Sequence, residues 1–230
     1  MSNCAILIFA KSTFLESNSK IIVSCAKKNH SLWHLLNSKT IAIARKSKIP
    51  FFIVDESVQI GVNFGERISN AAQTIFDKGF SKLIIIGNDC PALSAAHLMV
   101  AKSKLQHNDL VFGPDINGGA YLIGISKNEF AFTDFQSFTW QSNQLFKSIT
   151  TFYDINQTFI LPHLDDVNNA SSFKSALHKL CFKSKLKFEL LRLFVNTLHV
   201  INYVDQVFFF IKIASVNYRG PPKTVYNLAY

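Results

Sequence analysis

The chain has 230 residues and a formal net charge of +9, with 48% hydrophobic and 17% charged residues. This length allows one sizeable core and about one domain with an appendage, and the hydrophobic content excludes a disordered chain. The longest uncharged stretches near the C-terminus fall short of the roughly 20 apolar residues of a membrane-spanning helix, so we expect no membrane span.

The first elements along the chain are a strand, a helix and a second strand. Cys4–Phe9 is a continuous apolar run that predicts a buried strand, and a polar loop is expected after it. Apolar residues keep helical spacing over Ser31–Lys46, which predicts a helix. Pro50 ends this pattern and precedes a second predicted strand, Phe51–Val54.

The same alternation of helix and strand continues. Gly65–Lys78 has an apolar helical face, and Gly79 fits the position after the C-terminus of that helix. The run Leu83–Ile86 predicts a third buried strand. Ser94 can cap a third helix that ends at residue 104, and Leu110–Phe112 predicts a fourth strand.

Strands that alternate with helices predict an α/β fold with a mostly parallel, Rossmann-like sheet flanked by helices on both faces. Ligands of such sheets bind outside the carboxyl ends of the strands. Asn88 and Asp89 stand where the third strand ends, and Pro91 stops that strand from continuing. Their side chains can therefore reach a ligand, although Asn, Asp and Pro are also common turn residues for local reasons.

The cysteines and the N-terminus bear on the compartment. The four cysteines are scattered without a CxxC pattern, which argues against a disulfide framework and a zinc site. The apolar run Ala5–Ala10 is shorter than the ~7 to 15 residues of a signal-peptide core, so we expect a cytoplasmic protein. The positive charge suits an anionic ligand such as a phosphate compound, and also nucleic acid; charge does not choose between them.

A second segment, DLVFGPDINGGAYLIGIS from Asp109 to Ser126, combines with FGERISNAAQTIFDKGFSKLIIIGNDCPALS to suggest a family. Over about Ala5–Phe173 the chain resembles the bacterial glycosyltransferase-like family of radical-SAM/selenodomain-associated transferases, which is of the GT-A nucleotide-diphospho-sugar type. The residues that carry the resemblance form the patterns Gly-x-Asp-x-Pro and Gly-Pro-x-x-Asp-Gly-Gly-x-Tyr-Leu-x-Gly: Gly87, Asp89, Pro91, Gly113, Pro114, Gly118, Gly119, Tyr121, Leu122 and Gly124.

The resemblance implies a transferase that binds a nucleotide sugar and passes the glycosyl group to an unknown acceptor. It also implies Mg²⁺ or Mn²⁺, because a hard cation held by one or two carboxylates can bridge diphosphate oxygens. The residues implied for the metal are Asp89, Asp115 and Asn117. The residues implied for the nucleotide are Ala10, Lys11, Arg67, Asn88, Gly118 and Gly119.

The sequence departs from the family pattern at three places. Of the basic signature Lys-x-Pro-x-x-Gly-x-x-Lys-Thr-Arg after the first strand, only Lys11 remains in register. Asn117 replaces the acid before Gly118, and Asp115 is a possible substitute for it. Asn168 replaces the second acid of an Asp-Val-Asp segment. Asn117-Gly118 is also a strong hairpin-turn signal, which leaves a purely structural interpretation open.

Two other functions remain open. A nucleotidyltransferase would use the same crevice and metal but would attack the α-phosphate, and it normally needs a glycine-rich, basic first loop that is absent here. A degenerate family member would keep the fold as a non-catalytic binding module, which the loss of both second acids favours.

We assign residues 1–173 to a nucleotide-binding domain and residues 174–230 to a basic, helical C-terminal extension. The extension is expected to pack on the domain, with Lys183 and Lys187 in solvent. A membrane-surface or nucleic-acid role is the alternative, and we do not expect nucleic acid as the partner. The residues expected at the contact are Leu180, Leu190, Leu193 and Phe194.

Overall fold

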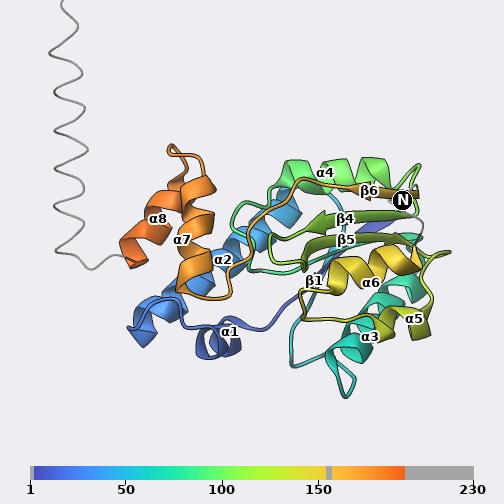
Figure 1. The fold of residues 1–230 in the computed structure, drawn as a ribbon, viewed down its shortest axis with the longest axis horizontal. Coiled ribbons are helices and arrows are strands. Elements are labelled where there is room, and N and C mark those ends of the chain that lie inside the picture. The colour runs from blue at the N-terminus through green and yellow to red at the C-terminus, as the bar shows by residue number, and fades with distance from the viewer. Residues whose placement is uncertain (1–2, 154–156, 195–230) are drawn as a thin grey trace, which may run out of the picture.

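A computed structural model describes residues 3–153 and 157–194. These residues form a six-stranded sheet with the order β2-β1-β3-β5-β4-β6, covered by helices on both faces (Figure 1). The strands are β1 (Cys4–Phe9), β2 (Phe51–Val54), β3 (Lys82–Ile86), β4 (Leu110–Pro114), β5 (Ala120–Ser126) and β6 (Thr158–Ile160). The helices are α1 (Thr13–Ser19), α2 (Ala26–Lys46), α3 (Phe64–Asp77), α4 (Ala95–Lys104), α5 (Phe132–Ser137), α6 (Leu145–Phe152), α7 (Ala170–Lys179) and α8 (Lys185–Phe194).

The four strands predicted from the sequence are present and run in one direction. β1 pairs in parallel with β2 and β3, and β4 shares their direction because both β3 and β4 pair antiparallel with β5. The mostly parallel α/β sheet is therefore confirmed. β4 and β5 form a hairpin, as Asn117-Gly118 indicated, and Gly118 has a φ of +87° there. An added Cβ at Gly118 would also lie 2.2 Å from the carbonyl oxygen of Asn143.

Successive residues of the buried strands pack on opposite faces of the sheet, because side chains alternate along a strand. In β1, Leu7 and Phe9 face a cluster with α3, α5 and α6, whereas Ile6 and Ile8 face a cluster with α2 and α4. Both faces are apolar because helices cover both, which explains why the strands show no alternation of apolar and polar residues. Two cores on one sheet hold the strand ends in place.

The predicted helices α3 and α4 are confirmed, with Ser94 as the N-cap of α4 and Gly79 at a φ of +92°. Two expectations for the segment after β1 were wrong. The polar loop contains the helix α1, and α2 begins at Ala26 rather than at Ser31. The N-cap of α1 is Ser12, whose amide and hydroxyl both donate to the carboxylate of Glu56 at 2.6 and 2.5 Å. Because Glu56 lies 44 residues from Ser12, the residues around α1 gave no sequence signal for this contact.

Helix α2 has 21 residues and is roughly 30 Å long at 1.5 Å per residue. Its C-terminal half packs on the sheet, where Ala44 is fully buried. Its N-terminal half packs instead in a third core with α7 and α8, through Leu32, Trp33 and Leu36. Figure 1 shows α1, α7 and α8 gathered around this half, beyond the end of the sheet.

The C-terminal helices thus pack mainly on α2. Leu190 is fully buried in this third core, and Lys183 is exposed as expected. Lys187 was expected in solvent but is half-buried, because its ammonium donates to the carbonyl oxygen of Leu180 at 3.0 Å. The boundary proposed after residue 173 falls inside α7 and stays a prediction, and residues 195–230 lie outside the described part. Among residues 3–153 and 157–194, no helix is long and apolar enough to cross a membrane.

Truncation of Leu190 tests whether the third core supports the whole molecule. Leu190→Ala should lower the free energy of unfolding by about 2–5 kcal/mol, because it removes a fully buried side chain. The matched control on the same helix is Phe188→Ala, whose side chain is 63% exposed and whose loss should change stability by less than about 0.5 kcal/mol. Urea unfolding measures both, and equal effects would contradict the packing described here.

Candidate functional site at the carboxyl edge of the sheet

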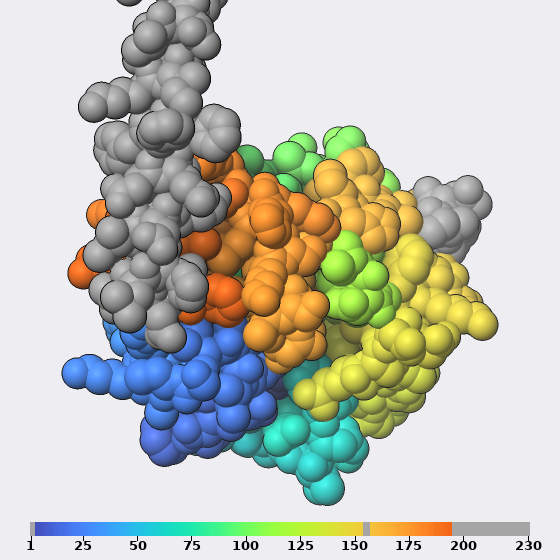
Figure 2. All heavy atoms as spheres, turned by 60° about the vertical axis from the view of Figure 1, so that its left-hand side comes forward, coloured from blue at the N-terminus to red at the C-terminus, as the bar shows by residue number. Residues whose placement is uncertain are grey.

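The candidate site lies where β1 and β3 end side by side. β1 is flanked by β2 on one side and β3 on the other, so the crossovers through α2 and α3 cover opposite faces of the sheet. This is the topological switch point at which ligands bind in open α/β sheets. In Figure 2 the blue region of α1 and the start of α2, the teal segment before α3, the yellow segment before α6 and the orange segment leading into α7 come together on one face.

Asn88 joins the two strand ends. It is buried, and its amide nitrogen donates to Asn37 Oδ1 at 2.6 Å and to the carbonyl oxygen of Lys11 at 3.4 Å. Lys11 itself is exposed, and its ammonium lies 3.4 Å from Ser19 Oγ. Asn88 therefore fixes the first loop against β3, and the charge of Lys11 faces solvent beside that junction.

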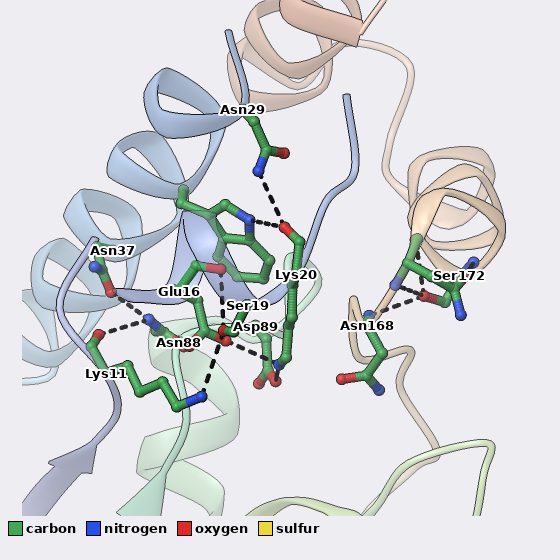
Figure 3. Close-up of polar contacts among 12 residues, drawn as sticks. Lys11, Glu16, Ser19, Lys20, Asn29, Asn37, Asn88, Asp89, Asn168 and Ser172 are labelled. Atoms are coloured by element: carbon green, nitrogen blue, oxygen red, sulfur yellow. Dashed lines mark hydrogen bonds and ion pairs between the residues drawn. The ribbon is translucent and has the colours of Figure 1, made fainter. Parts of the chain in front are cut away.

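Asp89 forms an ion pair with Lys20. Lys20 Nζ lies 2.7 Å from Asp89 Oδ2 and 2.9 Å from Glu16 Oε1, so one ammonium bridges two carboxylates (Figure 3). The side chains of Lys20 and Asp89 are 23% and 21% exposed, whereas that of Glu16 is 5% exposed. Burial favours the neutral amine, but the charges and hydrogen bonds of Asp89 and Glu16 outweigh it and raise the pKa of Lys20.

A second carboxyl group, Asp166, lies beside Asp89. The backbone amide of Val167 donates to the carbonyl oxygen of Asp89 at 2.8 Å, which brings the segment after β6 to the end of β3. Asp166 is 6% exposed, and its Oδ1 is buried without a hydrogen-bond partner. Burial raises the pKa of Asp166 well above its usual range, and the charges of Asp89 and Asp115 raise it further, while Lys20 acts in the opposite direction.

The turn between β4 and β5 supplies the other predicted metal residues. Asp115 is buried, and its Oδ1 accepts the amides of Asn117 and Gly119, each at 2.7 Å. Asn117 is exposed, and Gly118 takes the left-handed turn position. Asp115 thus closes the turn with one oxygen and influences Asp166 electrostatically. The predicted metal residues Asp89 and Asp115 come from different strands. Both lie close enough to Asp166 for their charges to raise its pKa.

The remaining two predicted residues lie at the edges of this region. Ala10 directly follows β1, is half-buried, and its amide donates to the carbonyl oxygen of Val54 at 3.4 Å. Arg67 lies in the first turn of α3, and its Nε is buried without a hydrogen-bond partner. No described contact joins Arg67 to Asp89.

A row of polar side chains on α2 holds the loops of the site. Asn29, Trp33 and Asn37 are spaced by four residues and therefore share one face of the helix. Asn29 Nδ2 and Trp33 Nε1 both donate to the carbonyl oxygen of Lys20, at 3.1 and 3.0 Å. Further along, Lys39 Nζ donates to the carbonyl oxygen of Cys90 at 2.9 Å. Burial lowers the pKa of Lys39 to about 8.

Sequence reasoning missed Lys20, Glu16 and the α2 row, and it noticed Asp166 only as part of the Asp-Val-Asp resemblance. The spacing of Glu16 and Lys20, four residues apart, is a recognised helical ion-pair signal, but the helix itself was not predicted. Nothing in the sequence pairs Lys20 with Asp89, which is 69 residues away.

The carboxylates do not form a ready divalent metal site. Asp89 is paired with Lys20, and Asp115 accepts two backbone amides that close the turn. Among residues 3–153 and 157–194, no group of three or more His, Cys, Asp or Glu side chains is arranged to hold a metal ion. The donor set present does not fit the Mg²⁺ or Mn²⁺ that the family resemblance implies.

Comparison with solved structures defines the class of fold. A protein from Desulfovibrio desulfuricans G20, provisionally described as a nucleotide-diphospho-sugar transferase, matches with a TM-score of 0.72 and 21% identity over 85% of this chain and 100% of that chain. A homologue of Mycobacterium tuberculosis rv0371c from Mycobacterium sp. strain JC1 matches at 0.50 and 13% identity over 83% and 98%. The chain therefore has the fold of the nucleotide-diphospho-sugar transferases.

Residues 46–142 match the model of the family DUF2064, described as an uncharacterized protein conserved in bacteria. This segment includes Asn88, Asp89 and the β4–β5 turn. Rv0371c of M. tuberculosis in complex with manganese matches at a TM-score of 0.48 and 10% identity over 78% of this chain and 100% of that chain, which is too distant for its metal to bear on this protein. No curated protein matches the sequence.

Replacement of Asp166 tests the electrostatics of the site. An acid whose pKa is raised by folding binds more protons in the native state, so its contribution to stability falls as pH rises above about 3.9. Asp166→Asn should therefore raise the free energy of unfolding, and by more at pH 7 than at pH 5. Chemical denaturation at both pH values measures this gain.

The neighbouring buried acid, Asp165, provides the control. It accepts hydrogen bonds from Lys179 Nζ at 2.5 Å and from Ser175 Oγ at 2.7 Å. Asp165→Asn should lower the free energy of unfolding by about 1–3 kcal/mol at pH 7, because it removes one partner of a charge-assisted hydrogen bond. If Asp166→Asn also lost stability, the conclusion that the buried Asp166 carboxylate destabilises the fold would be contradicted.

Proposed function

We propose that the protein is a glycosyltransferase-like enzyme that binds a nucleotide sugar at the carboxyl edge of β1 and β3. One observation carries the proposal: the first loop, the end of β3 and the segment after β6 converge on Asp89 at the switch point of this fold. The unpaired, buried Oδ1 of Asp166 supports it, because buried polar groups without partners concentrate at functional sites. The resemblance to the radical-SAM/selenodomain-associated transferases belongs to this proposal as well.

The chemistry of the donor fits this arrangement. Glycosyl transfer breaks the bond between the anomeric carbon and a diphosphate oxygen, so the site must stabilise the negative charge of the leaving nucleoside diphosphate. Lys11 and the turn residues Gly118 and Gly119 are proposed to contact the nucleotide, with Asn88 and Ala10 holding the first loop in position. Mg²⁺ or Mn²⁺ is not part of the proposal, because the donor set of the described residues does not fit it.

A nucleotidyltransferase is a weaker alternative. Such an enzyme needs a mobile, glycine-rich first loop that wraps the triphosphate. Here the segment after β1 holds no glycine and forms α1, whose N-cap Ser12 is tied to Glu56. The segment is therefore better suited to form one wall of the site than to wrap phosphates.

Ligand-induced thermal stabilisation tests the binding step. A nucleoside diphosphate or nucleotide sugar from a panel should raise the melting temperature, because a hundredfold excess over Kd adds about 2.7 kcal/mol to the free energy of unfolding. The corresponding nucleosides and free sugars should not. Lys11→Glu should abolish the shift, because it places a carboxylate beside the diphosphate. The control, Lys78→Glu, changes an exposed lysine that precedes β3 at the opposite edge of the sheet, and should leave the shift unchanged.

An assay for the release of nucleoside diphosphate from the bound nucleotide sugar then distinguishes an active transferase from a non-catalytic binding module. Turnover by the wild-type protein supports the transferase. Binding without turnover for any acceptor supports the degenerate module, and a protein that no nucleotide stabilises refutes the proposed function.

A further inference from the structure

The site contains its own cation. Lys20 Nζ lies within 3 Å of one oxygen of Asp89 and one oxygen of Glu16, so a single ammonium sits between two carboxylates. Glu16 is almost fully buried, so without this ammonium its charge would lie uncompensated in the interior. The pair is thus part of the folded structure rather than a contact between freely moving surface side chains.

Lys20 is also held in place along its whole length. Its carbonyl oxygen accepts hydrogen bonds from Asn29 Nδ2 and Trp33 Nε1, and its ammonium lies 5.4 Å from the centre of the Trp33 ring. Asn29 additionally binds the amides of Ile22 and Val23 through Oδ1, which fixes the chain immediately after Lys20. Figure 3 shows the side chain extending from this anchored backbone down to Asp89.

The partial exposure of the Lys20 and Asp89 side chains allows a ligand to reach the pair. Lys20 and Asp89 keep about a fifth of their side-chain surface, whereas Glu16 lies behind them. A lysine ammonium has three donors, and two carboxylates engage two of them. One donor is available for a phosphate oxygen that approaches from the exposed side.

We propose that Lys20 takes the place of the divalent cation in this protein. Its ammonium neutralises Asp89 and Glu16, excludes Mg²⁺ and Mn²⁺ from Asp89, and presents positive charge to the diphosphate. Nucleotide binding, which rests on the proposed function above, accordingly needs no divalent metal. The role of Lys20 toward metal ions does not depend on that function and is tested separately.

The first experiment uses Mn²⁺ alone, with binding measured by electron paramagnetic resonance of the free ion. The wild-type protein should bind Mn²⁺ weakly, and Lys20→Met should bind it at least about tenfold more tightly, because the substitution leaves Asp89 and Glu16 without a counter-charge. Lys20→Met combined with Asp89→Asn should lose this gain. Lys78→Met removes an exposed lysine at the opposite edge of the sheet and should leave Mn²⁺ binding as in the wild type.

Lys20→Gln keeps a hydrogen-bonding side chain and serves if Lys20→Met does not fold, which melting curves will show. Its affinity for Mn²⁺ should also increase. Wild-type protein that already binds Mn²⁺ through Asp89 as tightly as the variants would overturn the proposal. So would folded Lys20 variants that gain no affinity.

The second experiment measures nucleoside diphosphate binding by calorimetry with EDTA or with Mn²⁺. Wild-type affinity should be the same in both conditions, and Lys20→Met should bind only with Mn²⁺. Wild-type binding that disappears in EDTA would overturn the proposal. If no nucleotide binds under any condition, the proposed function fails, while the Mn²⁺ titration still decides the role of Lys20.

Discussion

The length of α2 is the constraint on which the site depends. A helix that only covered the sheet would end near the strand ends, but α2 continues beyond them and exposes an apolar face that must be buried. Helices α7 and α8 and the segment around Ile22 bury that face. Its polar face meanwhile holds the chain around Lys20, Asn88 and Cys90. One helix therefore joins the C-terminal helices to the geometry of the site.

Electrostatic compensation is the second feature of the site. Asp89, Asp115, Asp166 and Glu16 gather near the ends of β3 and β4, yet Lys20 is the cation that contacts two of them. Asp166 is left buried with one unpaired oxygen, which costs stability that an apolar residue would not. Buried polar groups without partners concentrate at functional sites, and this is the physical basis for placing the proposed function here.

The fold by itself is compatible with many functions, whereas the residues of the site allow fewer. Similarity at 21% identity to a protein provisionally described as a nucleotide-diphospho-sugar transferase establishes the fold alone. Sheets of this kind bind ligands at the carboxyl ends of their strands, which is where the proposed site lies. The groups at the carboxyl end of β3 include a cation of the chain itself, because Lys20 approaches Asp89 from the end of α1. Asn117 and Asn168 are uncharged, which is consistent with the proposal that the positive charge of the site comes from the chain itself.

The sequence alone determined the four strands β1 to β4 and the helices α3 and α4, because apolar runs such as Cys4–Phe9 and helical periodicity such as that of α3 are local signals of burial on both faces. It did not predict β6, which has only three residues. It also placed Asp89 at a strand end and Asn117-Gly118 in a turn, since both follow from neighbouring residues. Only the tertiary structure decided what surrounds Asp89. Contacts such as Lys20 with Asp89 join residues far apart in the chain, and their energy depends on burial and distance that no local pattern encodes.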